Sequence, residues 1–174
     1  MNRALIIIDM QNDFITGSLG NPEAIRAEDY IVSDLDLSAF STIFLTRDTH
    51  FGDYLDTLEG QKLPIAHCTY GSDGWQISTR IMEKVHASNI PYHFLDKHAF
   101  GYDWGNMPFS LAAFDEIVLV GVCTDICVIS NALILKSIYY NTPVQVIAYM
   151  CAGTTEEKHD QAIEVMRSCQ IDIL

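Results

Sequence analysis

Apolar runs of strand length alternate with helical patterns along almost the whole chain. The apolar runs cover residues 3–9, 41–46, 92–97, 116–121, 144–149 and 170–174. Several are apolar at consecutive positions, which is typical of parallel strands that are buried on both faces. The intervening patterns predict helices over 22–36, 75–87, 106–113, 125–140 and 155–168. This alternation predicts a three-layer α/β/α fold of Rossmann type, in which right-handed crossovers connect a mostly parallel six-stranded sheet.

One long connection, residues 49–74, interrupts the alternation. Its secondary-structure signals are weak, and it contains His50 and His67 together with several carboxylates. Loops of this length in a compact domain are usually either functional or disordered. The number of potential ligand side chains favours a functional role.

Composition narrows the class of protein. The 174 residues predict one domain spanning 1–174, and 49% hydrophobic with 19% charged residues is typical of a globular chain. A net charge of −13 argues against a nucleic-acid partner and against binding to an anionic membrane. There is no apolar run of membrane-spanning length, and the N-terminal run is too short for a signal peptide. The five cysteines form no zinc-finger pattern, so we expect free thiols in a cytoplasmic protein.

Polar groups of complementary chemistry follow the predicted strands. Asp9 ends the first strand, Asp48 and His50 follow the second, Lys97 ends the third, and the turn "GVCTDIC" (121–127) follows the fourth. Each group alone is as often structural as functional. Ligands of open parallel sheets bind at the carboxyl ends of the strands, so their convergence there predicts a site.

The two cysteines of "VGVCTDICV" are expected to play different parts. With Thr124 as N-cap of the following helix, Cys127 lies in the first turn, where the helix dipole and free N–H groups favour a thiolate. Cys123 precedes the cap, and its backbone N–H, with that of Cys127, could form an oxyanion hole. The alternative is a pair of small buried hydrophobic residues. The C-x-x-x-C spacing does not match the C-x-x-C of dithiol oxidoreductases.

Five motifs in order resemble the isochorismatase-like cysteine hydrolases, and among them nicotinamidases and related amidases. They are "ALIIIDMQNDF" (4–14), "TRDTH" (46–50), "PIAHCTYGSDGW" (64–75), "LDKHAFGYDW" (95–104) and "VGVCTDICV" (120–128). The resemblance covers nearly the whole chain. It implies a hydrolase that cleaves a small heteroaromatic carboxamide to an acid and ammonia through a cysteine thioester, with a role in NAD salvage.

The resemblance also assigns catalytic residues. Asp9 of "DMQNDF", Lys97 and Cys127 match the Asp–Lys–Cys triad of the family. The position of Cys123 implies a cis peptide bond between Val122 and Cys123, which directs an oxyanion-hole amide into the pocket.

A divalent metal beside the triad is implied in the same way. Asp48 and His50 match the D-x-H ligand pair of nicotinamidases, and His67 matches their last histidine. Glu59, nine residues after His50, is expected as the fourth ligand, with Asp56 as its competitor. Such nitrogen and oxygen ligands suit Zn²⁺, with Fe²⁺ or Mn²⁺ as alternatives.

The substrate pocket is less well defined by the motifs. Phe14 and Trp104 match aromatic positions that sandwich the substrate ring in nicotinamidases, although each could equally be a core residue. His98, beside Lys97, is a further candidate for the pocket wall. Pro64 stands where nicotinamidases often have tryptophan, which leaves room for a substrate other than nicotinamide. The family commonly forms dimers or tetramers, so a homo-oligomer is expected.

Two other functions stay open. One is a metal-free isochorismatase-like or carbamoyl hydrolase. The other is a non-catalytic member that binds a small molecule, which the complete set of Asp9, Lys97 and Cys127 disfavours.

Overall fold

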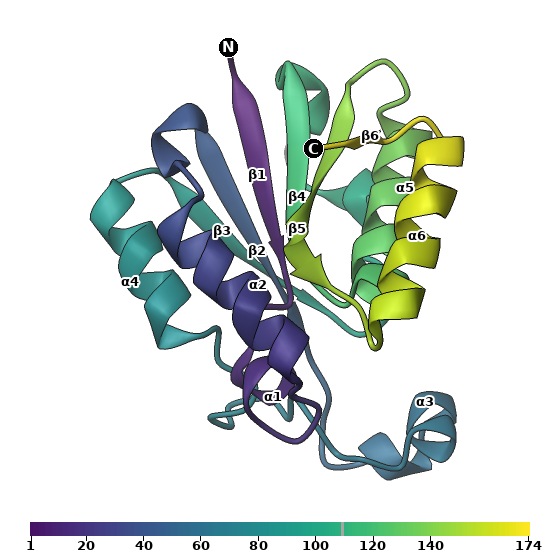
Figure 1. The fold of residues 1–174 in the computed structure, drawn as a ribbon. Helices are drawn as coiled ribbons and strands as arrows, with labels where there is room; N and C mark the ends of the chain where they lie inside the picture. Colours follow the sequence, from purple (N-terminus) through teal and green to yellow (C-terminus); the bar gives the residue numbers. More distant parts are fainter. Residues whose placement is uncertain (109) are drawn as a thin grey trace.

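A six-stranded parallel sheet runs through the chain from its first element to its last. The computed structural model describes residues 1–108 and 110–174. The strands are β1 (Arg3–Ile8), β2 (Thr42–Asp48), β3 (Tyr92–Lys97), β4 (Glu116–Val122), β5 (Val144–Ala152) and β6 (Asp172–Ile173). Their order is β3-β2-β1-β4-β5-β6, and every neighbouring pair is parallel (Figure 1). The predicted α/β architecture is therefore confirmed.

Helices cover both faces of this sheet. The α-helices are α1 (Asn12–Ile15), α2 (Pro22–Ser33), α3 (Leu58–Lys62), α4 (Thr79–Ser88), α5 (Ile129–Ile138) and α6 (Glu156–Ser168). The pair α2 and α4 lies on one face and the pair α5 and α6 on the other, whereas α3 stands apart near the carboxyl ends of the strands (Figure 1). None of the helices in residues 1–108 and 110–174 is long and apolar enough to cross a membrane.

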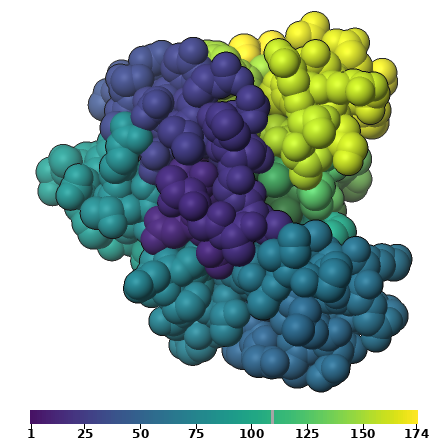
Figure 2. All heavy atoms as spheres, turned by 60° about the horizontal axis from the view of Figure 1, so that its bottom comes forward, coloured from purple at the N-terminus to yellow at the C-terminus, as the bar shows by residue number. Residues whose placement is uncertain are grey.

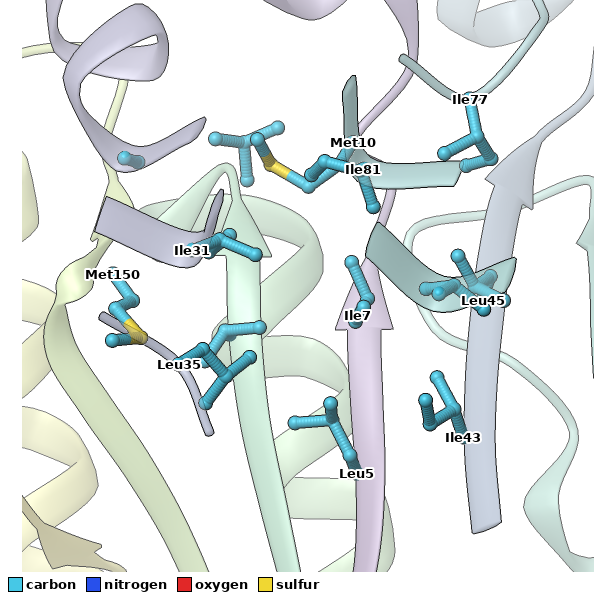
Figure 3. Packing of buried hydrophobic residues seen from close by; sticks show 14 of the residues in the cluster. Leu5, Ile7, Met10, Ile31, Leu35, Ile43, Leu45, Ile77, Ile81 and Met150 are labelled. Atoms are coloured by element: carbon cyan, nitrogen blue, oxygen red, sulfur yellow. The ribbon is translucent and has the colours of Figure 1, made fainter. Parts of the chain in front are cut away.

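Alternate residues of the central strand β1 supply two separate cores. Leu5 and Ile7 belong to the cluster under α2 and α4, together with Ile31 and Ile81 (Figure 3). Ala4, Ile6 and Ile8 pack into the cluster under α5 and α6. All residues from Ala4 to Ile8 are fully buried, which explains why this strand is apolar at consecutive positions.

Two predicted helices differ from the structure. The helix predicted over 75–87 begins only at Thr79, because Ile77 pairs with Gln11 in a β-bridge and Ser78 donates its N–H to the Met10 carbonyl. The prediction of one helix over 106–113 is wrong for its described residues, which contain the end of one short 3₁₀ turn and the whole of another. Pro108 explains the break, because proline has no N–H and disfavours helix in the residue before it.

Gly121, near the end of β4, offers a test of how closely β4 and β1 pack. Its φ is +120°, and an added Cβ would clash with the carbonyl oxygen of Ile8. We predict that Gly121→Ala lowers the free energy of unfolding by roughly 2 to 4 kcal/mol, since it combines backbone strain with overpacking. Urea denaturation measures the change. Gly52→Ala is the matched control, because a Cβ there meets no atom within 4 Å. Equal effects of the two substitutions would contradict this account.

Candidate active site

The carboxyl ends of β1 and β3 and the helical turn after β4 bring Asp9, Lys97 and Cys127 together. The Lys97 ammonium Nζ lies 2.7 Å from Asp9 Oδ2 and 3.6 Å from Cys127 Sγ. Asp9 is fully buried, and Lys97 and Cys127 are nearly so. The structure therefore brings together the three residues that the sequence motifs propose as acid–base group, cation and nucleophile.

Asp9 has a left-handed backbone conformation, and its carboxylate lies against Lys97. Asp9 has a φ of +48°, and its N–H bonds to Thr46 Oγ1 at 3.1 Å, while the same hydroxyl donates to Asp9 Oδ1 at 2.6 Å. Thr46 thus occupies one carboxylate oxygen and leaves the other to Lys97. Burial raises the pKa of Asp9, although Lys97 opposes the shift, so its carboxylate is a stronger base than an exposed aspartate.

The surroundings of the Cys127 thiol disfavour its ionisation. Burial raises its pKa well above the ordinary value, Asp9 adds to the shift, and Lys97 opposes it. The helix dipole was expected to favour the thiolate of Cys127. Burial removes water from the thiolate, and this effect on the pKa is larger than that of the dipole. Proton removal needs a base, and Asp9 is in contact with the thiol.

The turn that carries Cys127 begins one residue earlier than predicted. It is a π-helical turn over Thr124–Val128 that continues into α5, and Cys123 occupies the N-cap position. The carbonyl of Cys123 accepts bonds from Ile126 and Val128. The prediction of Thr124 as N-cap is wrong, because its hydroxyl bonds to His159 Nδ1 at 2.8 Å instead. The predicted cis bond between Val122 and Cys123 is confirmed.

A second cluster of polar side chains adjoins the group formed by Asp9, Lys97 and Cys127. One donor atom from each of Asp48, His50, Glu59 and His67 can be chosen so that all four lie within 4.8 Å of one another. Asp48 Oδ2 lies 2.8 Å from His50 Nε2 and 3.4 Å from His67 Nε2. Two imidazole nitrogens and two carboxylate oxygens suit a divalent cation such as Zn²⁺. His67 Nδ1 bonds to the Ile65 carbonyl at 2.8 Å, which leaves Nε2 available to a metal.

Asp48 links the two clusters. Its Oδ1 lies 3.3 Å from Lys97 Nζ, and its Oδ2 faces the two histidines. Hydrogen bonds from His50 and His67 and the charge of Lys97 outweigh burial, so the pKa of Asp48 lies well below its usual range. Glu59 is a member of the four-residue cluster, whereas its sequence competitor Asp56 is not.

Two supporting residues were not identified from the sequence. Gln11 accepts the Asp48 N–H and donates to the carbonyls of Asp48 and Trp75. Asp13 accepts the Cys68 N–H at 2.7 Å and so fixes the backbone next to His67. Both lie in the "DMQNDF" motif, so their polar character beside a buried strand end was the available signal.

A pocket of about 420 Å³ opens onto Cys127, Asp48, Glu59 and His67. Its remaining lining residues include Phe14, Leu19, Leu63, Phe100, Cys123 and Ile126. Figure 2 views this end of the molecule, where the blue residues of the 49–74 segment project beside the purple residues that follow β1. The pocket therefore combines a reactive polar floor with largely apolar walls.

The aromatic residues named from the motifs are placed differently. Phe14 lines the pocket, with its ring centroid 5.5 Å from that of His67. Trp104 is fully buried in the core under α5 and α6, donates to Asn131 and is not among the pocket-lining residues. His98 bonds to the Thr49 carbonyl and lines a neighbouring hollow. Phe100, which the sequence interpretation missed, lines the pocket from the aromatic-rich loop after Lys97.

The Isochorismatase domain model matches residues 3–174. The chain belongs to the isochorismatase family. The nicotinamidase/pyrazinamidase of Mycobacterium tuberculosis is 27% identical over 99% of this chain and 98% of its own length. The nicotinamidase/pyrazinamidase of Bacillus subtilis has a TM-score of 0.82 at 24% identity, with 99% of each chain covered. A pyrazinamidase of Pyrococcus horikoshii in complex with zinc has a TM-score of 0.75 at 23% identity, covering 100% of this chain and 99% of that one.

Membership of the four-residue cluster predicts which carboxylate substitution weakens metal binding, that of Glu59 or that of Asp56. We predict that Glu59→Ala weakens Zn²⁺ binding by at least about tenfold, since one charged donor is lost. Competition with a chromophoric chelator measures the affinity. Asp56→Ala is the matched control and should leave the affinity unchanged, because Asp56 lies outside the cluster. The opposite ranking would show that the ligand set is wrong.

Proposed function

We propose that this protein is a metal-dependent amidase that cleaves a small heteroaromatic carboxamide to a carboxylic acid and ammonia. The observation that carries the proposal is the buried Cys127 thiol in contact with both Asp9 and Lys97 at the floor of a pocket. The full-length similarity to a curated nicotinamidase/pyrazinamidase supports the amide as the bond attacked.

In the proposed mechanism, Asp9 accepts the proton of Cys127 as the thiolate attacks the carboxamide carbon. The raised pKa of Asp9 suits it to take up this proton and to pass it to departing ammonia. Backbone N–H groups of Cys123 and Cys127 stabilise the oxyanion. Water then attacks the thioester, with Asp9 as its base, and releases the acid. Lys97 holds negative charge on Asp9 and on the thiolate throughout.

The metal would be held by Asp48, His50, Glu59 and His67, whose donor types fit Zn²⁺, Fe²⁺ or Mn²⁺. When bound, it supplies a Lewis acid that can hold a ring nitrogen of the substrate. Phe14 offers an apolar surface to the ring from beside His67. The zinc complex of the structurally similar pyrazinamidase supports this assignment.

The substrate class has a direct test. We predict that the metal-loaded protein releases ammonia from nicotinamide or pyrazinamide, and that a chelator removes this activity until metal is restored. A coupled ammonia assay measures the rate. Activity that survives complete metal removal, with a carbamoyl amide as the preferred substrate, would favour the metal-free hydrolase instead. Tight ligand binding without turnover of any amide would favour the non-catalytic alternative.

Substitution of the two pocket cysteines should have very different effects on kcat. We predict that Cys127→Ala lowers kcat by at least about 1000-fold, because the nucleophile is lost. Cys123→Ala should retain most of the wild-type kcat, since only the backbone of Cys123 takes part. Steady-state kinetics on the best amide, with mass spectrometry after alkylation, check both. Full activity in Cys127→Ala would overturn the nucleophile assignment.

A further inference from the structure

A second hollow of about 440 Å³ lies beside the pocket that contains Cys127. It is lined by Leu58, Glu59, Lys62, Leu63, His98, Ala99, Phe100 and Ile126. Most of these side chains are apolar. The hollow shares Glu59, Leu63, Phe100 and Ile126 with the first pocket, so the two spaces adjoin one another.

Two of the lining residues expose apolar surface to solvent. Leu58 has 78% and Phe100 46% of its surface exposed. Isolated exposed hydrophobic residues are ordinary, but apolar residues that line a hollow next to a ligand pocket are typical of a ligand subsite.

The residues between the two spaces are held by buried groups. The side chain of Asn131, itself fully buried, donates to the carbonyls of Phe100 and Cys127. The buried Tyr54 donates its hydroxyl to the Leu63 carbonyl at 2.9 Å. The shared wall is thus tied both to the nucleophile helix and to the 49–74 segment, which gives the hollow a defined shape.

We propose that this hollow binds an apolar group extending from the substrate ring, so that the preferred substrate is an alkyl- or aryl-substituted heteroaromatic carboxamide. This inference rests on the proposed amidase function. The carboxamide would lie at Cys127, the ring would lie between Phe14 and the metal donors, and the extension would pass over Phe100 and Leu63 toward Leu58. Transfer of each methylene group from water to apolar surface raises kcat/KM by about three- to fourfold.

The test compares nicotinamide with its methyl, propyl and pentyl derivatives, substituted at ring carbon 5 or at ring carbon 6. We expect kcat/KM to rise by at least about tenfold from methyl to pentyl in one of the two series. A steady fall in both series, with nicotinamide itself turned over, would overturn the subsite and leave the amidase function intact. Failure to hydrolyse nicotinamide and every derivative would overturn the amidase function.

Two matched variants separate a subsite from a general apolar surface. Leu58→Ser should remove most of the gain for the pentyl derivative and leave kcat/KM for nicotinamide unchanged. Leu55→Ser is the control, because Leu55 is 55% exposed in the same segment but lines neither space. Equal losses in both variants and on both substrates, with a change in oligomer size by light scattering, would show that Leu58 serves an interface and would overturn the proposal.

Discussion

The buried ammonium group of Lys97 is the charge on which the site depends. Its side chain is only 1% exposed, and it is surrounded by Asp9, Asp48, the Ala99 carbonyl and the Cys127 thiol. A buried cation without such partners costs several kcal/mol, so the ends of β1, β2 and β3 must meet at one point. Burial opposes the ionised form of Lys97, but its anionic partners raise its pKa well above the ordinary value, which keeps the cation permanently charged.

Charge balance connects Lys97 to the cluster of donor atoms. Asp9 and Asp48 both contact the Lys97 ammonium group, and Asp48 and Glu59 both belong to the cluster of donor atoms, so three carboxyl groups stand near a single ammonium group. A divalent cation would offset that excess of carboxylates, and the imidazole nitrogens of His50 and His67 supply two further donor atoms. Since Asp48 faces both groups, a cation at the cluster also changes the field at Cys127.

The sequence was sufficient for the architecture because consecutive apolar positions, as in β1, identify strands buried on both faces. It also located Asp9, Asp48 and Lys97, since strand ends of a parallel sheet share one edge. Trp104 shows what the sequence could not predict. An aromatic residue at a motif position can be either a core residue, as Trp104 with its bond to Asn131 is, or a residue that lines the pocket. The short turns around Pro108 and the start of the turn at Cys123 depend on local hydrogen bonds that periodicity does not encode. The roles of Gln11 and Phe100 depend on contacts between segments distant in sequence.

The 49–74 segment has a further consequence for how such a protein can diverge. Asp13 attaches its far end to the residues after β1 through the N–H of Cys68, and Gln11 donates to the carbonyl of Trp75, which directly follows the segment. None of its residues forms part of a named strand of the sheet. Insertions or replacements within it that keep His50, Glu59 and His67 can therefore reshape the ligand pocket while the strands that carry Asp9 and Lys97 keep their register. The sheet and the segment that covers the pocket are thus separate parts of the chain, and new ligand preferences can arise at little cost to the stability of the fold.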